Sequence, residues 1–93
     1  MARTEVLKYA EAMEIELKEN EHKGGWKECS TGFLIKKLDE ETKELVEVVE
    51  TYRYLKNESL MHGDMPELKA RILSEAADVG NIAMMIADVC KAL

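Results

Sequence analysis

Two pairs of acidic residues stand three positions apart in this sequence, Glu41 with Glu44 and Glu75 with Asp78. Each pair begins where an otherwise apolar stripe is interrupted, and the members of each stripe recur in alternating steps of four and three, the spacing of one face of a packed helix. Residues three apart on a helix project from nearly the same side, so each pair presents two carboxylates together. Because a buried, unpaired carboxylate is costly, we expect a cation beside these pairs.

The two stripes predict two long helices. The first stripe comprises Leu34, Leu38, Glu41, Leu45, Val48, Tyr52 and Leu55, and the second comprises Leu68, Ile72, Glu75, Val79, Ile82, Ile86, Val89 and Leu93. We expect the first helix to be capped by Ser30 or Thr31 and to end near Asn57. Asp64 and Pro66, followed by an acidic residue, form a start signal for the second helix, which we expect to continue to the C-terminus.

A shorter helix is expected before these two, from about Thr4 to about Asn20. Its apolar face comprises Val6, Ala10, Met13 and Leu17. Breaks follow at 21–30, where two glycines disfavour helix, and at 58–65. Since no segment alternates like a strand, the sequence predicts an all-α fold, a single domain over residues 1–93 built from three main helices.

Composition and charge exclude several classes of protein. The chain has 93 residues, 46% of them hydrophobic and 34% charged, and a formal net charge of −6. That acidity disfavours a nucleic acid polymer as partner, because nucleic-acid binding needs a basic surface. Cys29 and Cys90 lack metal-ligand spacing, and no segment resembles a signal peptide or a membrane span. We therefore expect a cytoplasmic protein with reduced thiols and no membrane partner.

A second face of the last helix predicts assembly. Small residues keep the same four-three spacing there: Ala76, Gly80, Ala83, Ala87 and Cys90. A helix that is apolar on two sides is a central helix, and three helices give it few neighbours. We expect a homodimer or homotetramer that completes a four-helix-type bundle. The alternative is that the helix near the N-terminus alone covers this face.

The chemistry of the acidic pairs favours a hard divalent cation. If the two long helices pack antiparallel at about 8–10 Å, side chains from both reach a common ion. Four oxygen donors without His or Cys favour Mg²⁺, with Mn²⁺ possible, over zinc. Magnesium commonly keeps substrate phosphates as its remaining ligands, so the substrate class is a phosphoanhydride. Glu40 is a candidate for an additional or outer ligand.

Two other classes of protein are alternatives to a metal enzyme. The seam glutamates can instead merely set helix register in a non-catalytic oligomerisation or interaction protein. A ferritin-like di-iron protein needs Glu-x-x-His pairs on helices, and His22 and His62 lie in the breaks instead. The first of these alternatives stays open, and the second is excluded.

Two segments resemble a known family. The segment 38–45 (LDEETKEL), followed by 75–79 (EAADV), resembles the E-E-x-x-E and E-x-x-D signature of the MazG-like, all-α nucleoside triphosphate pyrophosphohydrolases. That family includes dimeric dUTPases, dCTP pyrophosphatases and phosphoribosyl-ATP pyrophosphohydrolases. The resemblance covers both long helices and implies a MazG-like helical bundle.

The resemblance also implies a reaction and roles for named residues. Water would attack a nucleoside triphosphate between its α- and β-phosphates, giving a monophosphate and pyrophosphate. The implied magnesium ligands are Glu41, Glu44, Glu75 and Asp78. Asn81 resembles a polar position that faces the substrate. We expect Glu41, at the more desolvated seam position, to orient or deprotonate the water, with Glu44 as the other catalytic candidate.

The first break is the candidate for substrate recognition. Trp26 is placed to stack on a base, Lys23 to contact phosphate and His22 to hydrogen-bond the base or sugar. Lys37, one turn before the first acidic pair, is another phosphate ligand candidate. The alternatives are a tryptophan that closes the end of the bundle, and solvated histidine and lysine side chains. Many members of the family continue into a further helix with basic residues, so here the phosphate contacts would come from these lysines or from a neighbouring subunit.

Overall fold

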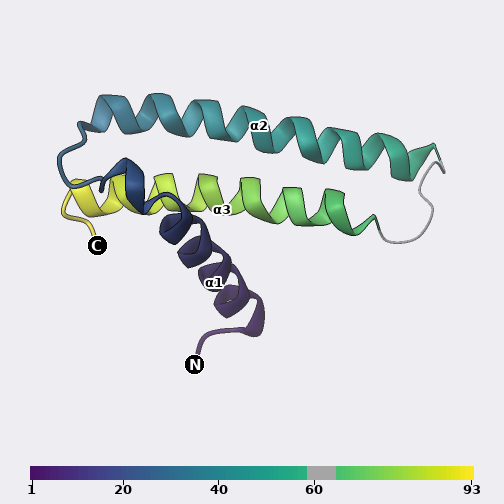
Figure 1. Cartoon of the computed structure of the whole chain (residues 1–93), viewed down its shortest axis with the longest axis horizontal. Helices are drawn as coiled ribbons and strands as arrows, with labels where there is room; N and C mark the ends of the chain where they lie inside the picture. Colours follow the sequence, from purple (N-terminus) through teal and green to yellow (C-terminus); the bar gives the residue numbers. More distant parts are fainter. Residues whose placement is uncertain (59–64) are drawn as a thin grey trace.

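The structure, a computed structural model, describes residues 1–58 and 65–93 and consists there of three long helices and one short 3₁₀ turn. The elements are α1 (Thr4–Glu19), η1 (Glu21–Lys23), α2 (Thr31–Asn57) and α3 (Pro66–Val89). No strand occurs in these residues, which confirms the expected all-α class. The helices α2 and α3 lie side by side and antiparallel, and α1 crosses α3 at a steep angle (Figure 1).

The start of α2 confirms the predicted cap. Ser30 has an extended backbone, and its hydroxyl oxygen accepts a hydrogen bond from the Phe33 amide at 3.1 Å. This bond satisfies one of the donors that the first turn of a helix leaves unpaired. The helix then ends at Asn57, as the periodicity predicts. The proposed cap of α3, Asp64, lies outside the described residues, and Pro66 is the first residue of that helix.

The prediction that the last helix reaches the C-terminus is wrong. α3 ends at Val89, and Lys91 adopts a left-handed conformation with φ 62°. The amides of Lys91 and Ala92 donate to the carbonyls of Asp88 and Ala87, at 3.0 and 2.8 Å. This reversed pairing is a Schellman motif, which ends a helix by satisfying its last carbonyls. The final member of the predicted stripe, Leu93, is consequently 82% exposed.

The buried apolar core of the described residues is small. It consists of Leu34 and Val48 from α2 and Ala77 from α3. The central helix α3 packs against both α1 and α2. No helix in the described residues is long and apolar enough to cross a bilayer.

The crossing of α1 over α3 depends on small residues. The Tyr9 hydroxyl donates a hydrogen bond to the Ala76 carbonyl, and the side-chain amide of Asn81 donates to the Met13 carbonyl at 3.0 Å. A Cβ atom at Gly80 would overlap with the phenol ring of Tyr9. Because Gly80 has no side chain, the Tyr9 ring can lie against α3 and reach the Ala76 carbonyl.

This crossing covers only part of the small-residue face of α3. α1 lies over Ala76 and Gly80, as the alternative interpretation of that face held, whereas Ala83 and Cys90 are exposed. The predicted apolar face of α1 is likewise only partly correct. Met13 and Leu17 are half-buried, but Val6 and Ala10 are exposed, and Tyr9 rather than Ala10 contacts α3.

The crossing predicts opposite effects for the same substitution at two helical glycines. Gly32→Ala, where nothing lies within 4 Å of the added Cβ, should raise the free energy of unfolding by about 0.5–1 kcal/mol because alanine favours helix. Gly80→Ala should lower it by about 1–2 kcal/mol, because the overlap with Tyr9 exceeds that gain. Denaturant unfolding measures both variants, and equal stabilisation by the two would contradict the close packing at Gly80.

Candidate metal centre and adjoining cavities

Three carboxyl groups from two helices converge at the α2–α3 interface. Glu41 of α2 and Glu75 and Asp78 of α3 each offer an oxygen atom, and these three atoms lie within 4.8 Å of one another. All three side chains are half-buried. The antiparallel packing brings the predicted pairs together, and the one-turn spacing of Glu75 and Asp78 places both on the same side of α3.

The fourth predicted ligand lies at the edge of this group. Glu44 is exposed, and its carboxyl group is within hydrogen-bonding distance of both Glu41 and Glu75. Glu40 is also exposed and instead pairs with Lys37, at 3.5 Å between the ammonium nitrogen and a carboxylate oxygen. The cluster therefore has a half-buried centre of three carboxyl groups with Glu44 on its solvent side.

The protonation of the cluster reflects burial and mutual repulsion. Burial, as the largest cause, together with Glu44, Asp78 and Glu75 raises the pKa of Glu41 to about 7. Burial also raises the pKa of Asp78 to about 6, with the next contribution from Glu16. The pKa of Glu75 is raised for the same reasons, although Arg71 opposes the shift. Ionising all of these carboxyl groups together is thus unfavourable in the folded chain.

A fifth carboxylate, which the sequence analysis did not identify, comes from α1. Glu16 accepts a hydrogen bond from the Ser74 hydroxyl at 2.7 Å, and its carboxyl group lies within hydrogen-bonding distance of Asp78. Its spacing from Met13 put it on the packed side of α1, but α1 carries five glutamates, and spacing alone does not single this one out.

Two polar oxygen atoms beside the cluster are buried and have no hydrogen-bond partner in the described residues. They are Glu75 Oε2 and Asn81 Oδ1. Asn81 is only 4% exposed, and its amide nitrogen is engaged by the Met13 carbonyl. An unpaired buried acceptor costs about 1–3 kcal/mol, so both atoms point to a group that is absent from the isolated chain.

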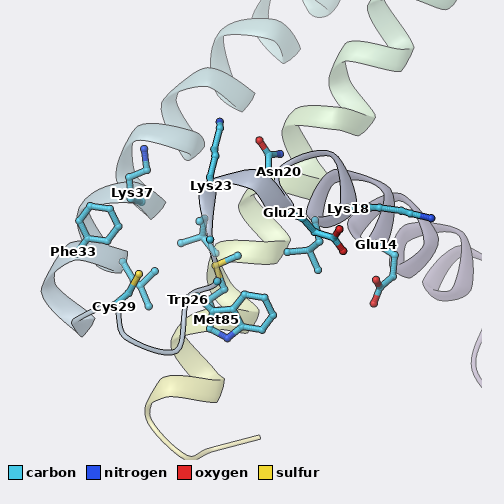
Figure 2. A pocket seen from close by; sticks show the side chains of 15 residues that line it. Glu14, Lys18, Asn20, Glu21, Lys23, Trp26, Cys29, Phe33, Lys37 and Met85 are labelled. Carbon is cyan, nitrogen blue, oxygen red and sulfur yellow. The ribbon is translucent and has the colours of Figure 1, made fainter.

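Two cavities adjoin the cluster. The larger, of about 670 Å³, is lined mainly by apolar side chains from α1, α2, α3 and the segment between α1 and α2 (Figure 2). The smaller, of about 250 Å³, is lined by Glu16, Glu41, Asp78 and Asn81. Both are lined by Leu17, Asn20, Lys23, Lys37, Ile82 and Met85. The two cavities therefore adjoin, and Glu41 and Asp78 of the cluster line the smaller one.

The two predicted phosphate-binding lysines lie where the cavities meet. Lys23 and Lys37 line both cavities, and their ammonium ends extend toward the same side in Figure 2. Lys37 is paired with Glu40, whereas Lys23 has no ion pair among residues 1–58 and 65–93. His22 is exposed in η1 and lines neither cavity.

Trp26 forms part of the wall of the larger cavity and is also anchored to the end of α3. Its indole nitrogen donates to Asp88 Oδ2 at 2.8 Å. Lys27 pairs with the same carboxylate and lies 5.5 Å from the centre of the indole ring. The hydrogen bonds from Lys27 and Trp26 lower the pKa of Asp88. Trp26 is thus tied to Asp88 near the end of α3 and lines the larger cavity.

The raised pKa values predict that the metal-free protein loses stability as pH rises. Glu41 and Asp78 have ordinary pKa values of 4.5 and 3.8 and folded values of about 7 and about 6. At a pH between the ordinary and the folded pKa values, the folded chain binds more protons than the unfolded chain. The two carboxyl groups therefore stabilise the fold at low pH, and this stabilisation is lost as pH rises through 6–7. With a chelator present, the melting temperature should be lower at about pH 8 than at about pH 5.

Two comparisons test the cause of that pH dependence. Magnesium added at about pH 8 should restore most of the lost stability, because a cation replaces the protons. Glu41→Gln should show a weaker pH dependence than Glu47→Gln, an exposed position on the same helix. A metal-free melting temperature that stays constant or rises over this range would contradict the assignment.

No protein-family model, no curated protein and no solved structure matches this chain. Its function is therefore inferred from the side chains and cavities themselves.

Proposed function

We propose that this protein is a magnesium-dependent nucleoside triphosphate pyrophosphohydrolase that releases a nucleoside monophosphate and pyrophosphate in the cytoplasm. The observation that carries the proposal is a pair of adjoining cavities whose lining has three chemically distinct parts. A carboxylate cluster stands at one end, two lysines line the middle, and an apolar cavity with a tryptophan lies at the other end. A nucleotide has the same order of parts: metal-bound phosphates and an aromatic base.

The residues of the cluster fit a hard divalent cation. Glu41, Glu75 and Asp78 supply three oxygen atoms within 4.8 Å of one another, and the unpartnered Glu75 Oε2 is a free donor atom. Glu44 is close enough to contribute at the outer edge. An all-oxygen set favours Mg²⁺ or Mn²⁺. Such a cation, when bound, neutralises phosphate charge and lowers the pKa of an attacking water.

The other residues of the two cavities are assigned to substrate binding, and Glu41 is assigned to the chemical step. Lys23, which has no ion pair in the described residues, and Lys37 are placed to contact the phosphates. Trp26 and the apolar wall are placed against the base, and about 670 Å³ is within the usual size of small-ligand sites. We assign water orientation to Glu41 because its side chain lines the smaller cavity, whereas Glu44 does not.

Assembly of the chain into a homodimer, or a homotetramer built from such dimers, is part of this proposal. The chain exposes 7084 Å², whereas a compact monomer of 10.6 kDa exposes roughly 5,500 Å². The difference exceeds the roughly 800 Å² that each partner buries in a typical stable interface. Exposed apolar residues that line neither cavity are available for it: Ile35, Val46, Leu73 and Ala83.

A panel of nucleoside triphosphates tests the reaction. With magnesium, at least one should be converted to a monophosphate plus pyrophosphate, and a chelator should abolish turnover. Glu41→Gln and Asp78→Asn should lower kcat/KM on the order of 100-fold or more because each removes a ligand charge. Glu47→Gln is the matched control and should keep activity.

Other outcomes of that panel would contradict the proposal. Release of single phosphate, or no metal-dependent turnover over a broad panel, would reject this reaction. Unfolding or dissociation by Glu41→Gln would support the alternative, in which seam glutamates only set the register of a non-catalytic helical protein.

Sedimentation equilibrium tests the assembly. The wild-type chain should sediment at two or four times 10.6 kDa. Val46→Glu should reduce the mass to that of one chain, because a buried, unpaired carboxylate opposes association. Thr42→Glu adds the same charge at another exposed position of α2 and serves as the comparison. A wild-type monomer at all concentrations would reject the assembly.

A further inference from the structure

We infer a second divalent-cation position in the smaller cavity, formed by Glu16 of α1 together with Asp78 and Asn81 of α3. It rests on the metal centre of the proposed function and adds residues that neither acidic pair contains. Asp78 is shared between the two positions. Through Glu16, α1 therefore takes a direct part in metal binding.

The first support is the position of Glu16. It lines the smaller cavity together with Asp78, and its Oε1 atom accepts a hydrogen bond from the Ser74 hydroxyl at 2.7 Å. Two neighbouring carboxyl groups are both acceptors when ionised, so they need a shared proton or a cation between them. An outer hydrogen bond such as that from Ser74 is the usual means of orienting a metal-ligating carboxylate.

The second and independent support is Asn81. Its side chain is more than nine-tenths buried, and its Oδ1 atom has no partner. Because its amide nitrogen donates to the Met13 carbonyl, the oxygen is fixed as the free end of the amide. Asn81 lines the smaller cavity together with Glu16 and Asp78. A neutral amide oxygen beside two carboxylates is a donor set that suits a hard cation. No group in the described residues donates a hydrogen bond to that amide oxygen.

The location gives the second position a distinct role. The cavity that Glu16, Asp78 and Asn81 line is also lined by Lys23 and Lys37. Glu75 belongs to the first group but does not line that cavity. The second position therefore faces the expected phosphates in the cavity that Glu41 also lines, and its residues hold the polyphosphate beside the water that Glu41 orients.

Manganese binding, followed by electron paramagnetic resonance without nucleotide, tests the inference. Free and bound Mn²⁺ give different spectra, so a titration counts the sites. The wild-type chain should bind two ions per chain, and two ions at the roughly 3.5–4 Å typical of paired sites should show spin coupling. Glu16→Gln should bind one ion with no coupling, because it weakens the second position on the order of 100-fold. Glu11→Gln, an exposed position on the same helix, should behave like the wild type.

Two further variants separate this inference from the proposed function. Ser74→Ala should weaken only the second ion, by about 10-fold, because it removes the support of Glu16 without removing a ligand. Glu41→Gln should weaken the first position instead. One bound ion in both the wild type and Glu16→Gln would overturn the second position and leave the first intact. Loss of both ions in Glu16→Gln would overturn the division into two positions, and no binding by the wild type would overturn the metal centre itself.

Discussion

The crowding of carboxyl groups between three helices is the constraint on which this structure depends. The carboxyl groups come from every long helix, and burial raises the pKa of Glu41, Glu75 and Asp78. Apolar packing around Leu34, Val48 and Ala77 must hold these groups together against their repulsion. A small core that supports a destabilising cluster is the pattern of a functional site, where proximity of like charges serves binding.

The crossing of α1 over α3 connects the packing of the fold to the chemistry of the cavities. Gly80 admits α1, and the adjacent Asn81 anchors it through the Met13 carbonyl. That same anchor leaves Asn81 Oδ1 unpaired beside the cluster and sets Glu16 against Asp78. A contact that looks purely structural on α3 therefore also determines which oxygen atoms face the cavity.

Much of the fold and part of the site follow from local patterns. The ends of α2, its Ser30 cap and the convergence of Glu41 with the acidic pair of α3 were all predictable, because helical periodicity and capping depend on neighbours in the sequence. The end of α3 was not, since the stripe continues to Leu93 while the chain turns at Lys91. A left-handed residue that is not glycine carries little signal in a sequence.

The sequence by itself determined which residues share a face of each helix, and hence that Glu41, Glu75 and Asp78 would meet if α2 and α3 packed antiparallel. Only the tertiary structure decided which part of α3 is covered by α1, and with it the place of Glu16 among five glutamates of that helix. The physical reason is that a face is set by the 3.6-residue period of one helix. The angle and register between two helices depend instead on how their side chains fit, here on the missing side chain of Gly80.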